Sequence, residues 1–165
     1  MVSKKFKGLV GLGNLGSEYE QTNHNIGVAA QAYFQKELEQ KLGQPLHYFK
    51  VCGYMNQSGV AVRNFIRNHN LELEEVLVIH DDSDLYRGDY KVVFGGGSGG
   101  HLGVQSILDH LQSPAFWRLK IGIRDPEEVD RKKAIAFVLQ KISPEQQEVF
   151  QTVFAKALED ILTKI

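Results

Sequence analysis

Asn14 and His24 lie in one glycine-rich stretch that follows the first hydrophobic segment of the chain. Histidine is the side chain whose unperturbed pKa is closest to neutrality, so a histidine on a loop beside amides and a carboxylate can act as a general base. Such a base takes a proton from water while the water oxygen attacks a carbonyl carbon. This chemistry requires a carboxylate partner and hydrogen-bond donors from other parts of the chain.

A candidate for the carboxylate comes from the acidic segment His80-Asp-Asp-Ser-Asp84, which follows an apolar run. Open α/β sheets bind their ligands at the ends of such strands. The three carboxylates and the histidine could hold a hard divalent cation, although that site would need further oxygen ligands from the fold. We favour the alternative, without a metal, in which Asp81 accepts a hydrogen bond from His24, fixes its tautomer and stabilises the imidazolium.

Two glycine-rich stretches are typical of loops that bind anionic groups. Residues 11–16 match the dinucleotide pattern G-x-G-x-x-G, but a polar stretch follows them in place of a helix, so we do not expect a dinucleotide site. Residues 95–100 suit a mobile loop whose N–H groups bind an anion or an oxyanion. Alternatively, these glycines allow close packing of a strand against a helix. Asn56 also has two interpretations. It could cap a helix, or it could direct its side-chain amide into the cleft that holds the anionic group.

The length of 165 residues and the hydrophobic content of 42% predict one compact domain that spans residues 1–165. The N-terminal segment is basic but lacks an apolar run long enough for a signal peptide or a membrane span, so we expect a cytoplasmic protein. Cys52 is the sole cysteine, which excludes an intrachain disulfide and a cluster of thiolate ligands. It could be a nucleophile paired with a histidine, but we favour its interpretation as a small buried hydrophobic side chain.

The formal net charge of −1 gives no sign of a nucleic-acid partner, because phosphate binding normally goes with an excess of basic residues. Acidic residues crowd residues 72–84 and the C-terminal segment. Several basic residues follow residue 85, namely Arg87, Lys91, Arg118, Lys120, Arg124 and the run 131–133. This asymmetry is compatible with a basic patch and equally with an ordinary solvated surface.

Hydrophobic periodicity predicts alternating strands and helices. The expected strands are residues 6–12, 47–52, 76–80, 90–94 and 117–123. The expected helices are residues 25–42, 58–69, 101–111 and 144–163, with Ser58 as a cap of the second and Ser143-Pro-Glu-Gln146 at the start of the last. This pattern indicates an α/β protein, a single-domain three-layer α/β/α fold with a mixed, mostly parallel sheet.

Ordered motifs cover most of the chain, from residue 8 to about 140. They are Gly11-Leu-Gly-Asn-Leu-Gly16 with Tyr19 and Thr22-Asn-His-Asn-Ile-Gly27, Tyr54-Met-Asn-Gln-Ser-Gly59, His80-Asp-Asp-Ser-Asp-Leu85, Gly95-Gly-Gly-Ser-Gly-Gly-His101 and Arg118-Leu-Lys-Ile-Gly-Ile123. In order and internal spacing they resemble the motifs of the bacterial peptidyl-tRNA hydrolase family. One such motif would be weak evidence, whereas the ordered set is specific.

The resemblance implies hydrolysis of the ester that joins a peptidyl group to the 3′-terminal ribose of tRNA, by a monomer without a metal or cofactor. His24 matches the catalytic histidine of the family, Asp81 the aspartate that supports it, and Asn14 the amide that helps distinguish blocked from free aminoacyl groups. The implied substrate contacts are Tyr19, Tyr54, Met55, Asn56, His101, Leu102 and Lys120. In such a reaction water attacks, amide or loop N–H donors stabilise the oxyanion, and no covalent intermediate forms.

The chain departs from the family pattern at several positions. Leu102 stands where members usually have Asn, which removes a polar contact. Val93 replaces a basic residue that helps to hold the tRNA 5′-phosphate, while Lys120 keeps the other half of that clamp. Cys52-Gly53 replaces Pro-Thr, and the stretch between the first helix and Tyr54 is shorter than usual, which predicts a missing hairpin.

Two other functions remain compatible with these departures. One is an RNA-binding protein without activity, although a pure binder has no need to keep both His24 and Asp81. The other is a hydrolase for a different ester or amide, for which weak tRNA contacts would be no handicap. A salt titration separates them, because tRNA binding weakens steeply as salt rises and binding of a small neutral substrate does not.

Overall fold

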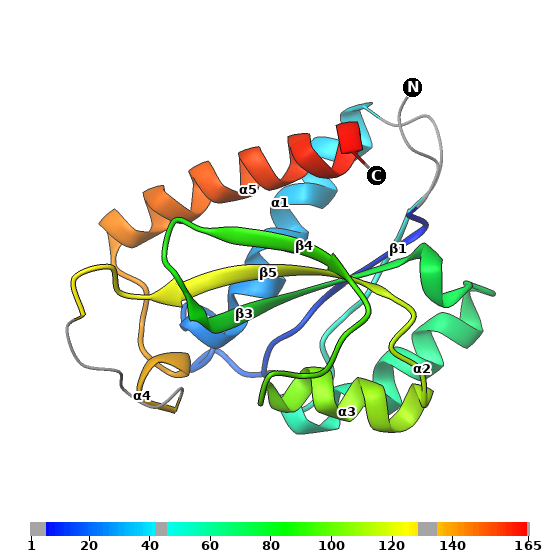
Figure 1. The fold of residues 1–165 in the computed structure, drawn as a ribbon. Helices are drawn as coiled ribbons and strands as arrows, with labels where there is room; N and C mark the ends of the chain where they lie inside the picture. Colours follow the sequence, from blue (N-terminus) through cyan, green and yellow to red (C-terminus); the bar gives the residue numbers. More distant parts are fainter. Residues whose placement is uncertain (1–5, 42–45, 129–134, 165) are drawn as a thin grey trace.

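The apolar runs of the sequence form a five-stranded sheet with the order β2-β1-β3-β5-β4 (Figure 1). The computed structural model describes residues 6–41, 46–128 and 135–164. Its strands are β1 (Gly8–Gly11), β2 (His47–Tyr48), β3 (Val76–Tyr86), β4 (Tyr90–Phe94) and β5 (Trp117–Arg124). Neighbouring strands are parallel except β4, which runs antiparallel to β5.

Helices cover both faces of this sheet. The α-helices are α1 (Ile26–Lys41), α2 (Ser58–Asn68), α3 (Leu102–Leu111), α4 (Ile135–Val138) and α5 (Pro144–Lys164), and the 3-10 helices are η1 (Asn23–Asn25), η2 (Met55–Gln57) and η3 (Leu73–Glu75). Helices α1 and α5 lie on one face, and α2 and α3 on the other (Figure 1). The expected three-layer α/β/α architecture with a mixed, mostly parallel sheet is confirmed. None of the described helices is long and apolar enough to cross a membrane.

Strand β3 explains why helices are needed on both faces. Its residues Val76, Leu77, Val78 and Ile79 are at most 1% exposed, and successive side chains point to opposite faces of the sheet. Leu77 and Ile79 pack with α1 and α5, whereas Val76 and Val78 pack with α2 and α3. Burial of each such side chain contributes about 1.5–3 kcal/mol. The strand is therefore a fixed base for the polar residues that follow, beginning with His80.

Strand β3 is longer than the sequence predicts. The expected strand ends at residue 80, but β3 continues to Tyr86 and pairs with β5 through Asp82, with an irregular register between these two residues. Hydrophobic periodicity misses the continuation because its residues are mostly polar. Asp81 consequently lies inside a paired strand and not in a loop after it.

The expected strand over residues 47–52 is wrong in its second half. Only His47–Tyr48 pair with β1. The chain leaves the sheet after Phe49, whose N–H still donates to the backbone oxygen of Leu9 at 2.9 Å. Cys52 therefore lies on an exposed loop, and its interpretation as a buried hydrophobic side chain is wrong.

Of the two predicted helix caps, the one of α5 is confirmed and the one of α2 is wrong. Ser143 and Gln146 form the expected reciprocal cap of α5, because the N–H of Ser143 donates to Gln146 Oε1 at 3.0 Å and the N–H of Gln146 donates to Ser143 Oγ at 3.2 Å. Ser58 is the first residue of α2 and not its cap, since η2 runs directly into this helix. Its hydroxyl instead donates to the backbone oxygen of Met55 at 2.7 Å.

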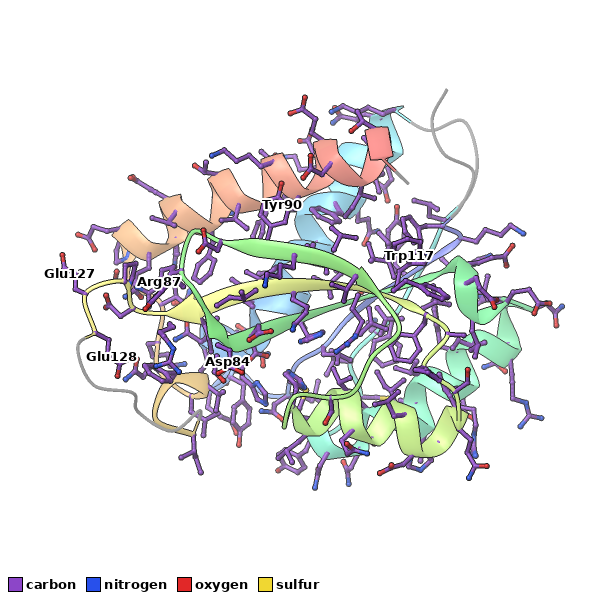
Figure 2. The ribbon with its side chains drawn as sticks, viewed as in Figure 1. Asp84, Arg87, Tyr90, Trp117, Glu127 and Glu128 are labelled. Carbon is purple, nitrogen blue, oxygen red and sulfur yellow. The ribbon has the colours of Figure 1, made fainter. Side chains whose placement is uncertain are left out.

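Several basic residues that follow residue 85 are used in internal contacts. Arg118 and Arg124 are buried, with only 4% and 8% of their surface exposed. Arg87 (Figure 2) forms an ion pair with Asp125 at 3.7 Å. The run 131–133 lies outside the described residues. These three arginines therefore do not form a broad basic patch.

Candidate active site

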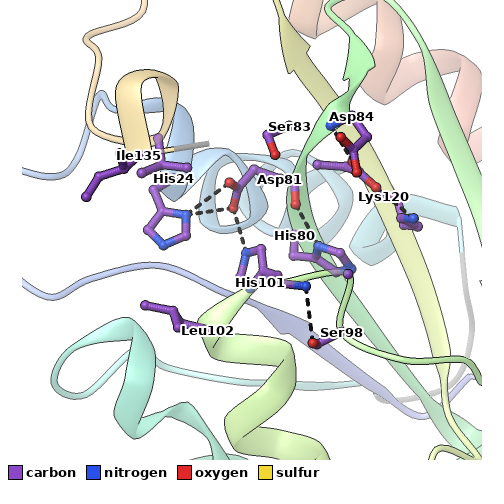
Figure 3. Close-up of a pocket in the computed structure, with 14 residues that line it drawn as sticks. His24, His80, Asp81, Ser83, Asp84, Ser98, His101, Leu102, Lys120 and Ile135 are labelled. Atoms are coloured by element: carbon purple, nitrogen blue, oxygen red, sulfur yellow. Dashed lines mark hydrogen bonds and ion pairs between the residues drawn. The ribbon is translucent and has the colours of Figure 1, made fainter. Parts of the chain in front are cut away.

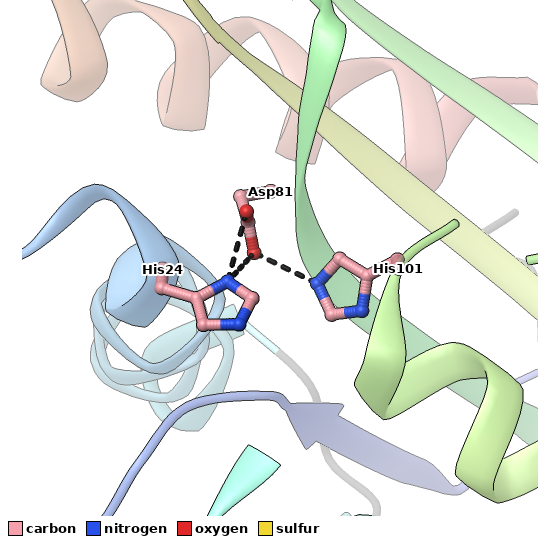
Figure 4. Close-up of side chains that lie close together, drawn as sticks. All are labelled: His24, Asp81 and His101. Atoms are coloured by element: carbon pink, nitrogen blue, oxygen red, sulfur yellow. Dashed lines mark hydrogen bonds and ion pairs between the residues drawn. The ribbon is translucent and has the colours of Figure 1, made fainter. Parts of the chain in front are cut away.

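His24 and Asp81 are hydrogen-bonded to each other. The Nδ1 atom of His24, in η1, lies 2.9 and 3.0 Å from the two carboxylate oxygens of Asp81, on β3 (Figure 4). Both residues are buried, with 8% and 2% exposed. A carboxylate only accepts, so Nδ1 of His24 donates, and the lone pair of the imidazole is on Nε2. In this tautomer Nε2 can take a proton from a nucleophile.

Gly11 and Gly27 allow η1 to lie close enough to the sheet for this contact. A Cβ at Gly27 would lie 2.2 Å from the backbone oxygen of Ile79, and a Cβ at Gly11 would lie 2.4 Å from the backbone oxygen of Gly27. A side chain at either position would push the start of α1 away from β3. The first glycine-rich stretch therefore contributes close packing at the point where His24 meets Asp81.

Two asparagines flank His24 and hold η1 in place. The amide of Asn23 donates to the backbone oxygen of Phe137 in α4 at 3.0 Å. The side chain of Asn25 accepts the N–H of Asn14 at 2.9 Å and donates to the backbone oxygen of Asn14 at 3.0 Å. The sequence alone predicts no separate role for Asn23 or Asn25. Their amides on both sides of a candidate base were the available signal.

His101 is a second donor to the same carboxylate, a contact that the sequence did not predict. Its Nε2 lies 2.8 Å from Oδ1 of Asp81 (Figure 4). Its Nδ1 accepts the N–H groups of Gly103 at 3.1 Å and Val104 at 3.2 Å, which caps α3. Because Nδ1 accepts, the ring proton is on Nε2 and is donated to Asp81. The expected helix over residues 101–111 begins one residue too early, since His101 is the cap and Leu102 the first residue of α3.

The surroundings of Asp81 keep it ionised. Burial would raise the pKa of Asp81, but the neighbouring His101 and the hydrogen bonds from His101 and His24 outweigh burial and hold that pKa well below its usual range. Burial has the opposite effect on a base and lowers the pKa of His80 to about 3. His80 donates from Nδ1 to the backbone oxygen of Asp81 at 2.7 Å, and its ring centroid lies 4.8 Å from that of His101. A neutral His80 therefore packs against His101 without adding a charge.

The triad of His24, Asp81 and His101 lines a cavity of about 350 Å³ (Figure 3). Leu102 and Lys120, two of the residues predicted to contact substrate, line the same cavity. The remaining predicted site residues are outside its described lining, and they are Asn14, Tyr19, Tyr54, Met55 and Asn56. The structure thus divides the predicted site into a cavity group and a second group.

The second group assembles around Asn14. Its Oδ1 accepts the N–H of Met55 at 2.6 Å, which joins the first glycine-rich stretch to η2. The rings of Tyr19 and Tyr54 meet edge to face, with centroids 6.4 Å apart. Asn25 connects Asn14 to the histidine-bearing η1 through the two bonds described above.

Asn56 is exposed within η2. The cap position of η2 is Tyr54, whose N–H donates to Gln57 Oε1 at 3.0 Å. The interpretation of Asn56 as a helix cap is therefore wrong. The other interpretation, an amide that contacts substrate, stays a prediction.

Comparisons with known proteins agree with the motif pattern. The family model described as peptidyl-tRNA hydrolase matches residues 8–165. The chain belongs to the peptidyl-tRNA hydrolase family. Curated relatives include the peptidyl-tRNA hydrolase of Aquifex aeolicus, 35% identical over 95% of this chain and 88% of the relative. That of Persephonella marina is 33% identical over 94% of this chain and 89% of the relative.

Solved structures of peptidyl-tRNA hydrolases share the fold. The enzyme of Acinetobacter baumannii matches with a TM-score of 0.80 at 30% identity, and the match covers 94% of this chain and 86% of that chain. A variant of the enzyme from the same species gives a TM-score of 0.82 at 30% identity, over 95% of this chain and 87% of that chain. The family resemblance read from the motifs is confirmed.

In this member of the peptidyl-tRNA hydrolase family, Lys120 is ion-paired. Its Nζ lies 2.7 Å from Oδ2 of Asp82. Burial raises the pKa of Asp82, but the hydrogen bond and charge of Lys120 together with the N–H of Asp84 outweigh burial and lower that pKa. On β4, Lys91 lies directly opposite Lys120, two residues before the Val93 that replaces a basic residue. Opposite residues of antiparallel strands point to the same face, so Lys91 places a second cation near Lys120.

The second glycine-rich stretch is a loop between β4 and α3. Gly95, Gly96, Gly99 and Gly100 have φ values of +75°, +84°, +59° and +84°, which other residues rarely adopt. A Cβ at Gly97, Gly99 or Gly100 would meet no described atom within 4 Å. Close packing is therefore the wrong explanation for these three glycines. Gly99 and Gly100 line the cavity, and the N–H of Gly100 donates to Oγ of Ser98 at 3.3 Å, so anion binding by this loop stays a prediction.

His24, Asp81 and His101 could each offer one ligand atom to a metal ion, within 4.8 Å of one another. The two nitrogen atoms that face Asp81, however, already donate hydrogen bonds to it, and both would have to lose their protons to bind a metal. The acidic segment is no better suited, because Asp82 is paired with Lys120. The geometry favours a hydrogen-bonded triad over a metal centre.

Proposed function

We propose that this protein hydrolyses the ester between the peptidyl group and the 3′-terminal ribose of tRNA and so recycles tRNA. The observation that carries the proposal is the hydrogen bond from Nδ1 of His24 to Asp81, which leaves Nε2 of a cavity-lining histidine able to accept a proton. Family membership supplies the substrate class, because the relatives from Aquifex and Acinetobacter are named peptidyl-tRNA hydrolases. The proposal includes a cytoplasmic monomer that needs no cofactor.

Water is the nucleophile in this reaction. His24 takes a proton at Nε2 while the water oxygen attacks the ester carbonyl carbon, which gives a tetrahedral intermediate with a negatively charged oxygen. The ionised Asp81 stabilises the imidazolium that forms. The intermediate expels the ribose oxygen, and His24 returns the proton to that oxygen. The products are tRNA and a peptide with a free carboxyl group.

A donor for the developing oxyanion comes from the cavity wall. It is the N–H of Gly99, because the N–H of Gly100 already donates to Oγ of Ser98 at 3.3 Å and the hydroxyl of Ser98 donates to Oε1 of Gln105 at 2.8 Å. Preorganised donors of this kind contribute about 2.7–4 kcal/mol each to transition-state stabilisation. Asn56 lies outside this lining, so we assign it, with Tyr54, to substrate contacts beyond the reacting carbonyl.

Asn14 distinguishes blocked from free aminoacyl esters by the direction of its remaining hydrogen bonds. Its Oδ1 is occupied by the N–H of Met55, so its Nδ2 donors are the groups left for substrate. A peptidyl group offers an amide carbonyl oxygen to such a donor. A free aminoacyl ester has an ammonium group at that place, which only donates.

The experiment is release of N-acetyl amino acid from N-acetyl-aminoacyl-tRNA by the wild-type protein, with the unblocked aminoacyl-tRNA as the control. Release from the blocked ester alone supports the proposal. Failure of a folded protein to release the blocked amino acid would contradict it. A non-catalytic RNA-binding role is not favoured, because nucleic-acid binding does not need a buried carboxylate that orients His24.

A further inference from the structure

The cavity beside His24 has a polar and an apolar part. Three large apolar residues belong to its described lining, Leu102, Ile135 and Val138, and we call them the apolar wall. Leu102 and Ile135 are 62% and 78% exposed. Figure 3 shows these two side chains near His24, one above and one below its ring in this view, with Lys120 farther away, beyond Asp81.

The apolar wall is attached to the triad at both ends. Leu102 is the first residue of α3 and directly follows His101, which is bonded to Asp81. Helix α4, which carries Ile135 and Val138, is tied to η1 by the hydrogen bond from Asn23 to the backbone oxygen of Phe137. Phe137 itself is only 3% exposed. Anchored elements of this kind keep a ligand group at a constant distance from the reacting atoms.

Clustered, exposed apolar side chains beside a reactive group are typical of a ligand site. Leu102 and Ile135 both line the cavity and present their side chains to water, and neither belongs to the two hydrophobic cores. A ligand group that packs against them would remove apolar surface of both from water. The ligand group that fits is itself apolar.

The polar part of the cavity decides which end of the ester lies at the apolar wall. The alcohol end of the substrate is a polyanionic RNA, which requires cations and N–H donors. The polar part of the lining holds Lys120, which is ion-paired with Asp82, together with Asp84 and the N–H of Gly99. Leu102 and Ile135 offer a phosphate or a ribose no such group, whereas an amino acid side chain can be apolar. The acyl end of the ester is therefore directed toward Leu102 and Ile135.

We propose that the apolar wall is a subsite for the side chain of the amino acid whose carbonyl carbon is attacked. The subsite makes the protein prefer esters in which this residue is large and apolar. The inference rests on the proposed hydrolysis of peptidyl-tRNA and adds a specificity to it. Leu102 is the main contact, because it is held next to His101.

The test uses one tRNA body charged by a ribozyme with either N-acetyl-leucine or N-acetyl-asparagine, which have similar size and different polarity. The wild-type protein is expected to favour the leucyl ester in kcat/KM by about tenfold, at the low end for an apolar pocket because this cavity is open. Leu102→Asn is expected to lower the preference to about twofold or less. Leu139→Asn is the matched control, since Leu139 is 51% exposed and outside the described cavity lining.

A loss of preference in Leu102→Asn, with the wild-type preference kept in Leu139→Asn, supports the subsite. Equal kcat/KM for both esters in the active wild-type protein overturns the subsite and leaves the proposed function intact. Equal losses of preference in both variants also overturn it. Failure of the wild-type protein to cleave either ester would refute the proposed function, and the subsite with it.

Discussion

His101 donates a hydrogen bond of 2.8 Å from Nε2 to Oδ1 of Asp81 while its other ring nitrogen caps α3. One side chain thus joins the start of a helix to the carboxylate that orients His24. The glycine loop before His101 and the triad are consequently coupled through a single ring. Substitutions at His101 can therefore separate its role as the cap of α3 from its role as a donor to Asp81.

His101→Asn is expected to lower kcat by about tenfold or more while the cap of α3 is kept. Asparagine is an effective helix cap, but its side chain is too short to replace the bond to Asp81, and a hydrogen bond to a charged group contributes about 1.5–3 kcal/mol. His101→Ala is the comparison variant and should be less stable than His101→Asn by about 1 kcal/mol, because the cap is lost as well. Steady-state kinetics and thermal unfolding measure the two effects. A wild-type kcat in both variants would exclude His101 as a positioning residue.

Asp81→Asn is expected to lower kcat by about 10³–10⁴-fold while KM and tRNA affinity change little. The amide cannot stabilise an imidazolium, and it can hold the ring of His24 in the wrong tautomer. Kinetics on N-acetyl-aminoacyl-tRNA together with a filter-binding measurement of tRNA affinity check this. An unchanged kcat would remove Asp81 from the mechanism.

Lowering the pH is expected to destabilise the fold through His80. An unfolded histidine binds a proton below about pH 6.5, whereas burial lowers the pKa of His80 to about 3 in the folded state. Between these values the unfolded state binds more protons, so the free energy of unfolding falls as the pH falls, by up to about 1.4 kcal/mol per pH unit. Urea unfolding of the wild-type protein and His80→Gln at several pH values measures the slope. The same slope in both proteins would contradict this origin.

Lys91→Met is expected to weaken tRNA binding and to reduce the slope of log K against log salt by about one, as for the loss of one phosphate contact. The reason is its position opposite Lys120, which supplies a cation near the place where Val93 provides none. Lys156→Met on α5 is a suitable control, because Lys156 is also exposed and α5 lies on the face opposite α3. Equal salt slopes for the wild-type protein and Lys91→Met would show that Lys91 does not contact RNA.

The periodic parts of the fold could be predicted from the sequence, and the aperiodic parts could not. Helix α1 and strand β4 follow regular apolar spacing, and the cap of α5 follows from Ser143 and Gln146. Helix α4 has only four residues, too few for a periodic signal. The polar end of β3 looks like a loop because its pairing with β5 depends on the distant chain.

The same distinction applies to the site. The hydrogen bond between His24 and Asp81 could be expected from their residue types and is confirmed, whereas their catalytic roles stay proposals. The bond between His101 and Asp81 depends on where the glycine loop delivers α3, which spacing alone does not give. The ion pair of Lys120 with Asp82 likewise appears only when β3 and β5 are paired.

The central claim is that His24 is the general base of peptidyl-tRNA hydrolysis. The most direct measurement is single-turnover release of N-acetyl amino acid from N-acetyl-aminoacyl-tRNA by the wild-type protein and His24→Ala, with tRNA affinity and circular dichroism recorded for both. The account predicts a rate at least about 10²-fold lower for the variant, with affinity and fold retained. A folded His24→Ala protein that releases the amino acid at the wild-type rate would contradict it.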